Sequence, residues 1–125
     1  MADAPHAPGE TGKTRALFCL AVLPAFFDLG DTARKEVFDS LVDGFSSLEE
    51  RFGVSVLGTL DDDRSMVGPS TGWPWTSYIL AEVPDAEAVS SICNIIRQTK
   101  VGEGRLWRFI RVETRIGRKL FFGNQ

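Results

Sequence analysis

Histidine and cysteine are scarce in this chain, which has one histidine and two cysteines among its 125 residues. The histidine, His6, lies in an Ala- and Pro-rich stretch ahead of the first apolar run. Catalysis or haem binding through histidine is therefore not expected, and the sequence predicts no cofactor. Cys19 and Cys93 fall in a strand-like and a helix-like segment, so they do not form the framework of a disulfide-rich domain. Two such thiols indicate a reducing compartment, and we expect a cytoplasmic protein.

Long apolar runs and a strong charge of one sign are also missing. No apolar run approaches the ~20 residues that span a bilayer, and the N-terminus lacks the basic-then-apolar order of a signal peptide. A net charge of -3 and a pI near 5.1 provide no basic surface for nucleic acid or acidic lipid. With 43% apolar residues, the composition is that of one globular domain that binds neither membranes nor nucleic acid.

The first 13 residues, MADAPHAPGETGK, have no apolar periodicity. They predict a disordered tail at residues 1–13, followed by one domain over residues 14–125. GETGKT, at positions 9–14, differs from a phosphate-binding loop because Ala7 occupies the position of its first glycine.

Apolar spacing beyond the tail predicts four strands and two helices. The strands are expected at residues 16–23, 54–60, 75–83 and 106–116. In the last, alternate residues point to opposite faces, with Ile110 and Val112 on one and Trp107 and Phe109 on the other. The helices are expected from Thr32 to about Phe52, after Asp31 as N-cap, and from Asp85 as N-cap to about Thr99. One apolar stripe on the first helix contains Phe38, Leu41, Phe45, Leu48 and Phe52.

This order of elements predicts an α+β fold of the ferredoxin-like βαββαβ type. An antiparallel four-stranded sheet would carry both helices on one face. The strands are apolar on both sides, so the second sheet face needs a cover, and large uncovered apolar surfaces usually mark interfaces. We therefore expect a homodimer that packs sheet against sheet.

The segment at residues 60–80, LDDDRSMVGPSTGWPWTSYIL, is the best candidate for a functional site. Its consecutive carboxylates, Asp61, Asp62 and Asp63, are candidates for a general base. The alternative is a solvated acidic turn with Arg64 as counterion. Magnesium or calcium would suit carboxylate oxygens, but the glycine and the distant glutamate of a calcium loop are missing, so no metal site is predicted.

Aromatic and arginine side chains supply the remaining candidates. Trp73, Trp75, Tyr78 and Trp107 would suit a flat ring such as indole or a polyketide, with core packing as the alternative role. Arg108 could bind a substrate carboxylate through two hydrogen bonds. A small aromatic molecule is the expected ligand. The alternation of the last strand also places Arg111, Glu113 and Arg115 on one face, where we expect them to pair with one another.

The order of elements and the two-sided sheet resemble the dimeric α+β barrel superfamily, which includes cofactor-independent monooxygenases of polyketide pathways and muconolactone isomerases. Residues 60–80 and NIIRQTKVGEGRLWRFIRVETRIGRKLF, at positions 94–121, resemble the IacB family of bacterial indole-acetate catabolism. The resemblance implies a role beside the oxygenation of an aromatic compound, and it carries over no catalytic residue. Two functions stay open: a cofactor-independent oxygenase-like or isomerase-like enzyme, and a non-catalytic accessory protein that binds an intermediate or a partner oxygenase.

Overall fold

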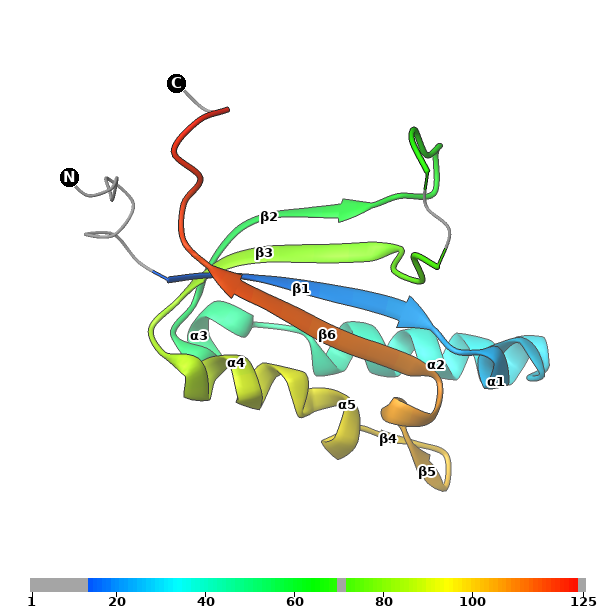
Figure 1. Cartoon of the computed structure of the whole chain (residues 1–125). Helices are drawn as coiled ribbons and strands as arrows, with labels where there is room; N and C mark the ends of the chain where they lie inside the picture. Colours follow the sequence, from blue (N-terminus) through cyan, green and yellow to red (C-terminus); the bar gives the residue numbers. More distant parts are fainter. Residues whose placement is uncertain (1–13, 70–71, 124–125) are drawn as a thin grey trace.

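The computed structural model describes residues 14–69 and 72–123, and its centre is one antiparallel sheet (Figure 1). The expected tail at residues 1–13 lies outside this range. Four strands pair in the order β2-β3-β1-β6. They are β1 (Thr14–Val22), β2 (Ser55–Asp61), β3 (Ser77–Val83) and β6 (Ile110–Gly117). This order, in which the first strand lies between the third and the last, confirms the predicted ferredoxin-like arrangement.

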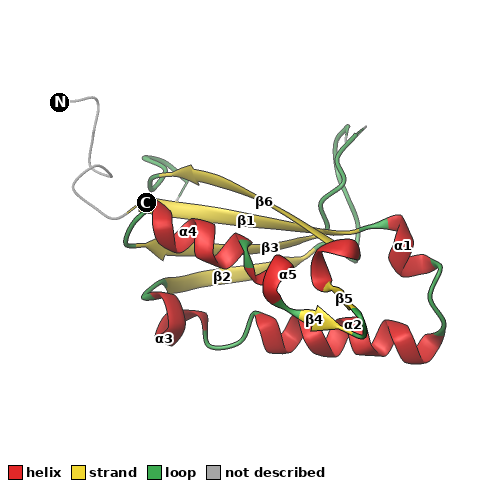
Figure 2. Ribbon diagram, turned by 90° about the horizontal axis from the view of Figure 1, so that it is seen from below, coloured by secondary structure: helices red, strands yellow, loops and turns green. Residues whose placement is uncertain are grey.

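The helices cover one face of the sheet (Figure 1; Figure 2). Between β1 and β2 lie α1 (Pro24–Phe27), α2 (Asp31–Gly44) and α3 (Leu48–Phe52). After β3 come α4 (Ala86–Cys93), α5 (Ile95–Gln98), a small hairpin of β4 (Lys100–Val101) and β5 (Gly104–Arg105), and the 3-10 helix η2 (Leu106–Arg108). No helix in the described ranges is long and apolar enough to cross a membrane.

The main core lies between the sheet and the helices. Phe18 of β1 is fully buried there, together with Val37 of α2, Ile92 of α4 and Leu106 of η2. Because successive strand residues point to opposite faces, Cys19 instead joins Ala21 and Trp75 in a small cluster on the other side of the sheet. Burial raises the pKa of the Cys19 thiol above its ordinary value.

The prediction of one continuous helix over residues 32–52 is wrong. The helix breaks after Gly44, and Ser47 adopts a left-handed conformation (φ 52°) before α3 begins. Arg51 stabilises the break, because its guanidinium donates hydrogen bonds of 2.7 Å to the carbonyl oxygens of Gly44 and Ser46. The expected apolar stripe is therefore divided between two helices, and Phe38, one of its members, is 49% exposed.

The two predicted N-caps have different outcomes. The side chain of Asp85 accepts a hydrogen bond from the backbone N–H of Ala88 at 2.8 Å, as expected of an N-cap. Asp31 is not a cap. Gly30 holds that position, and Asp31 is the first residue of α2, where its carboxylate lies 3.1 Å from the guanidinium of Arg34.

The last strand begins later than predicted. Residues 106–108 form η2, and the strand starts at Ile110. The buried side chain of Leu106 and its backbone hydrogen bond to the Thr99 carbonyl, 2.9 Å long, hold this turn against the core. Trp107 and Arg108 therefore project from a turn and do not continue the alternation of the strand.

Gly44 lies where α2 meets α5, and we expect Gly44→Ala to destabilise the protein. A Cβ at this position would lie 2.8 Å from Thr99 Oγ1 and 3.0 Å from Ile95 Cγ2. Helix propensity alone favours alanine over glycine by ~1 kcal/mol. Overpacking should outweigh that gain and lower the free energy of unfolding by about 1–2 kcal/mol, measured by urea denaturation. Gly117→Ala is the control, since a Cβ added to Gly117 would meet nothing within 4 Å. A Gly44→Ala protein at least as stable as the wild type would contradict the expectation.

Candidate functional site

The sheet face opposite the helices, called the open face below, carries the candidate site. Strand register places Leu17 of β1, Leu60 of β2 and Leu80 of β3 on this face, together with Tyr78. On β6 the open face carries Arg111, Glu113 and Arg115. The predicted pairing of these three is confirmed, because Glu113 accepts hydrogen bonds from Arg111 at 2.9 Å and from Arg115 at 3.1 Å. These bonds, that from Arg115 above all, lower the pKa of the Glu113 carboxyl.

Two segments rise on the open side of the sheet (Figure 1). The connection from β2 to β3 rises at one end, and the chain after β6 rises at the other. Both carry large apolar side chains that are exposed to solvent, namely Met66, Val67 and Trp73 in the first and Leu120, Phe121 and Phe122 in the second.

A concavity of about 620 Å³, called the open-face hollow below, lies where the β2–β3 connection meets the sheet. Its floor includes Leu17, Leu60 and Leu80, and its rim includes Asp62 and Trp73. The volume falls within the range of small-molecule sites, which are mostly apolar with a few polar groups in fixed positions.

A chain of hydrogen bonds along the rim connects three of the predicted site residues. The indole N–H of Trp73 donates to the hydroxyl oxygen of Tyr78 at 2.8 Å. That hydroxyl lies 3.2 Å from Asp62 Oδ2 and 3.1 Å from the carbonyl oxygen of Trp75. A phenol has one proton, so Tyr78 donates to only one of these two acceptors at a time. The backbone N–H of Asp62 donates to the Thr76 carbonyl at 2.9 Å and fixes the main chain at this position.

Trp75 supports the hollow without lining it. Its side chain is 4% exposed and packs against Cys19 and Ala21. The guanidinium of Arg111 lies 5.0 Å from the centre of its ring, a cation–π distance. Trp75 thus joins the rim of the hollow to the charged side chains of β6.

The three consecutive aspartates do not converge. Asp61 ends β2 in register with Ser77, and strand alternation directs it away from the open face. Asp62 lines the hollow, and Asp63 is exposed. Within residues 14–69 and 72–123, no three or more His, Cys, Asp or Glu side chains lie together as a metal site would require.

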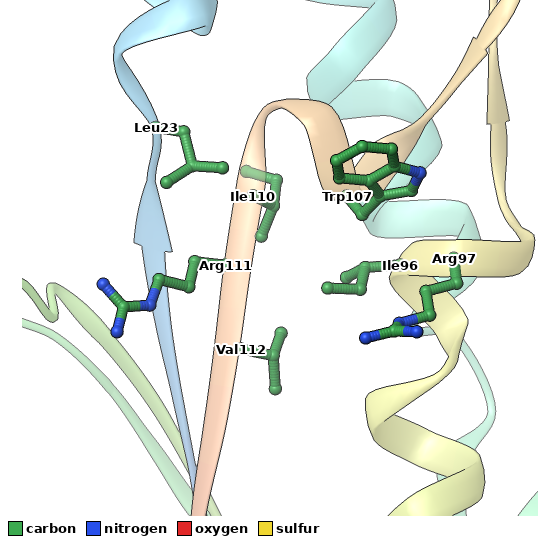
Figure 3. A pocket seen from close by; sticks show the side chains of 7 residues that line it. All are labelled: Leu23, Ile96, Arg97, Trp107, Ile110, Arg111 and Val112. Atoms are coloured by element: carbon green, nitrogen blue, oxygen red, sulfur yellow. The ribbon is translucent and has the colours of Figure 1, made fainter.

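Trp107 and Arg108 lie in other parts of the fold. Trp107 lines a second concavity, between α5 and β6, of about 540 Å³ (Figure 3). Arg108 borders a third, which also includes Asp28 and Glu103. The structure therefore brings together Asp62, Trp73 and Tyr78. Trp107 and Arg108 lie elsewhere, because η2 replaces the first three residues of the expected strand.

Sequence reasoning missed several residues that line these concavities. Met66 and Val67 belong to the open-face hollow, and Arg97 belongs to the concavity between α5 and β6. The signal for the first pair was available, because adjacent apolar side chains in a polar loop indicate a contact surface. Arg97 gave no comparable signal, since charged residues on a short helix usually face water.

Comparison with protein-family models finds no family that matches the chain, and comparison with curated proteins finds no match either. Among solved structures, one similar chain comes from a crystal structure provisionally assigned as a chlorite dismutase. It has a TM-score of 0.47 and 17% identity, and the match covers 89% of this chain and 44% of that one. The present chain thus spans less than half the length of that protein. The α+β fold class rests on the order of the sheet itself.

Proposed function

We propose that the protein binds a flat, neutral aromatic molecule in the open-face hollow. The observation that carries the proposal is the hydrogen-bonded chain from Trp73 through Tyr78 to Asp62, which places a carboxylate beside an apolar floor. Apolar contact for one face of a ring comes from Leu17, Leu60 and Leu80. The exposed ring of Trp73 offers a second aromatic contact.

The charge of the rim selects the kind of ring. Asp62 accepts hydrogen bonds, and Asp61 and Asp63 add negative charge nearby. A ligand that donates an N–H or O–H group toward Asp62 is favoured, whereas an anionic ligand is repelled. Indole and 2-naphthol have the required ring and donor. Indole is the first choice because of the sequence resemblance to proteins of indole-acetate catabolism. A role in that catabolism stays a prediction.

The same geometry suits proton transfer without a cofactor. Asp62 is positioned to accept the proton of a bound N–H or O–H group, and the hydrogen bond from Tyr78 orients its carboxylate. Loss of that proton makes an aromatic ring more electron-rich, which an isomerase-like or an oxygenase-like reaction would both use. A non-catalytic accessory role, as binder of an intermediate or contact of a partner oxygenase, is supported by the exposed apolar side chains around the hollow.

We further infer that a second copy of the chain covers the open face. Val67 is 96% exposed and Phe121 is 74% exposed, on the two segments that rise beside this face. Asp62 and Arg111 lie at the same end of the sheet on opposite edges. A two-fold rotation about an axis parallel to the strands would bring each of them opposite the other in the partner, so the face is complementary to itself in charge. The partner would then close the mouth of the hollow.

Binding of 2-naphthol or indole should depend on Trp73. We expect Trp73→Ala to weaken binding by ~1–2 kcal/mol, the value of an aromatic contact with its buried area. Calorimetric titration measures the affinity, and Tyr78→Phe tests the hydrogen-bonded chain. Phe38→Ala is the control, because Phe38 is 49% exposed against 55% for Trp73 and lies on α2, where it lines neither hollow. Equal losses in the two variants would place the ring elsewhere and overturn the proposal.

A further inference from the structure

The concavity between α5 and β6, called the α5–β6 hollow below, has the features of a second binding site. Its apolar wall consists of Leu23, Ile96, Ile110 and Val112. Trp107 of η2 projects beside this wall with 56% of its surface exposed (Figure 3). An exposed tryptophan next to an apolar wall of this kind offers a surface against which a ring can stack.

Arg97 supplies positive charge to the same hollow. Its guanidinium forms no ion pair or side-chain hydrogen bond within the described part of the chain. Arg111 also borders the hollow, but its guanidinium points to the other side of β6 (Figure 3). There it lies over the ring of Trp75 and pairs with Glu113. Arg97 is therefore the cation available to a ligand in the α5–β6 hollow.

The chain around the hollow is basic although the protein as a whole is acidic. Residues 97–108 contain four cations and one acid, against a net charge of -3 for the whole chain. The cations are Arg97, Lys100, Arg105 and Arg108, and the acid is Glu103. None of these four cations forms an ion pair among the residues that the structure describes. The local potential therefore favours an anion here, opposite to the acidic rim of the open-face hollow.

We propose that the α5–β6 hollow binds an aromatic carboxylic acid. The ring lies against Trp107 and the apolar wall, and the guanidinium of Arg97 binds the carboxylate through charge-assisted hydrogen bonds. The site is independent of the neutral-ring site on the open face, since the two hollows share no lining residue.

Two ligands of similar shape and different charge test the proposal. The probes are 1-naphthylacetate and its neutral methyl ester, which offers no N–H or O–H donor to Asp62 of the open-face hollow, titrated by calorimetry at pH 7 and low salt. Wild-type protein should bind the acid roughly tenfold tighter or more, as a hydrogen bond between charged groups predicts. Arg97→Gln should remove this preference, because it weakens the binding of the acid alone. Trp107→Ala should weaken both probes by the same factor, since it removes only the stacking surface.

Arg105→Gln is the matched control, because it removes the same charge from the basic segment without lining the hollow. We expect it to change the affinity for either probe by less than about twofold, since exposed charges are screened. If Arg105→Gln weakens the binding of the acid as much as Arg97→Gln does, the affinity reflects the overall positive charge of the segment, and the proposal is overturned. Equal affinity of the wild type for the two probes, or no binding of the acid, overturns it as well. Circular dichroism verifies that each variant is folded.

Discussion

Replacing Leu80 with glutamate is expected to convert a dimer into a monomer. Leu80 lies on β3, in the interior of the open face, and in one chain it is half-buried. In the proposed dimer it would be enclosed by the partner. A carboxylate without a partner in such an interface costs several kcal/mol, which corresponds to a rise in the dissociation constant of ~100-fold or more.

Analytical ultracentrifugation at micromolar concentration measures this change. Wild-type protein should sediment as a species of twice the 13.8 kDa chain mass, and Leu80→Glu as a single chain. Val42→Glu is the control, since Val42 is an equally apolar side chain that is 72% exposed on α2, on the helical side of the sheet. A monomeric wild type, or dissociation by Val42→Glu to the same extent, would show that the open face is not the interface.

Replacing Phe18 with alanine is expected to lower the free energy of unfolding by about 3–5 kcal/mol. Phe18 has no exposed surface and lies in the centre of the core between β1 and the helices. Removing its ring takes away buried apolar area and leaves a cavity that the surrounding strands cannot close, and both effects destabilise the folded state. A loss of this size is a large fraction of the stability of an ordinary domain.

Chemical denaturation at one fixed protein concentration measures the effect, since dimerisation would make stability depend on concentration. Phe27→Ala is the matched control. Phe27 is 63% exposed on α1 and makes an edge-to-face contact with Phe26, with 5.3 Å between ring centres. Losing that contact should cost about 1 kcal/mol.

Trp73→Ala should lower the free energy of unfolding by a similarly small amount. If it destabilised the protein as much as Phe18→Ala, Trp73 would be a structural residue and not a ligand contact.

The candidate site could be predicted only in part. The density of carboxylates and tryptophans at residues 60–80 indicated this segment, and Asp62 and Trp73 line a concavity there. Which of them converge depends on the pairing of β2 with β3, because the register Leu60–Tyr78 brings Tyr78 within reach of Asp62. Asp61 and Asp62 differ by one position and therefore lie on opposite sides of the sheet.

The amino-acid sequence alone determined the fold class, the order of strands and helices, the Asp85 cap and the Arg111–Glu113–Arg115 pairing. All four follow from apolar spacing or from contacts between residues close in the chain. Tertiary structure decided the break after Gly44, the turn at Leu106 and the separation of Trp107 from Trp73. The physical reason is that these features depend on contacts that no helix or strand repeat contains, such as the hydrogen bond from Leu106 to the Thr99 carbonyl and the packing of Leu106 in the core. Local periodicity does not reveal such a partner, because the hydrogen bond forms only once the chain has folded.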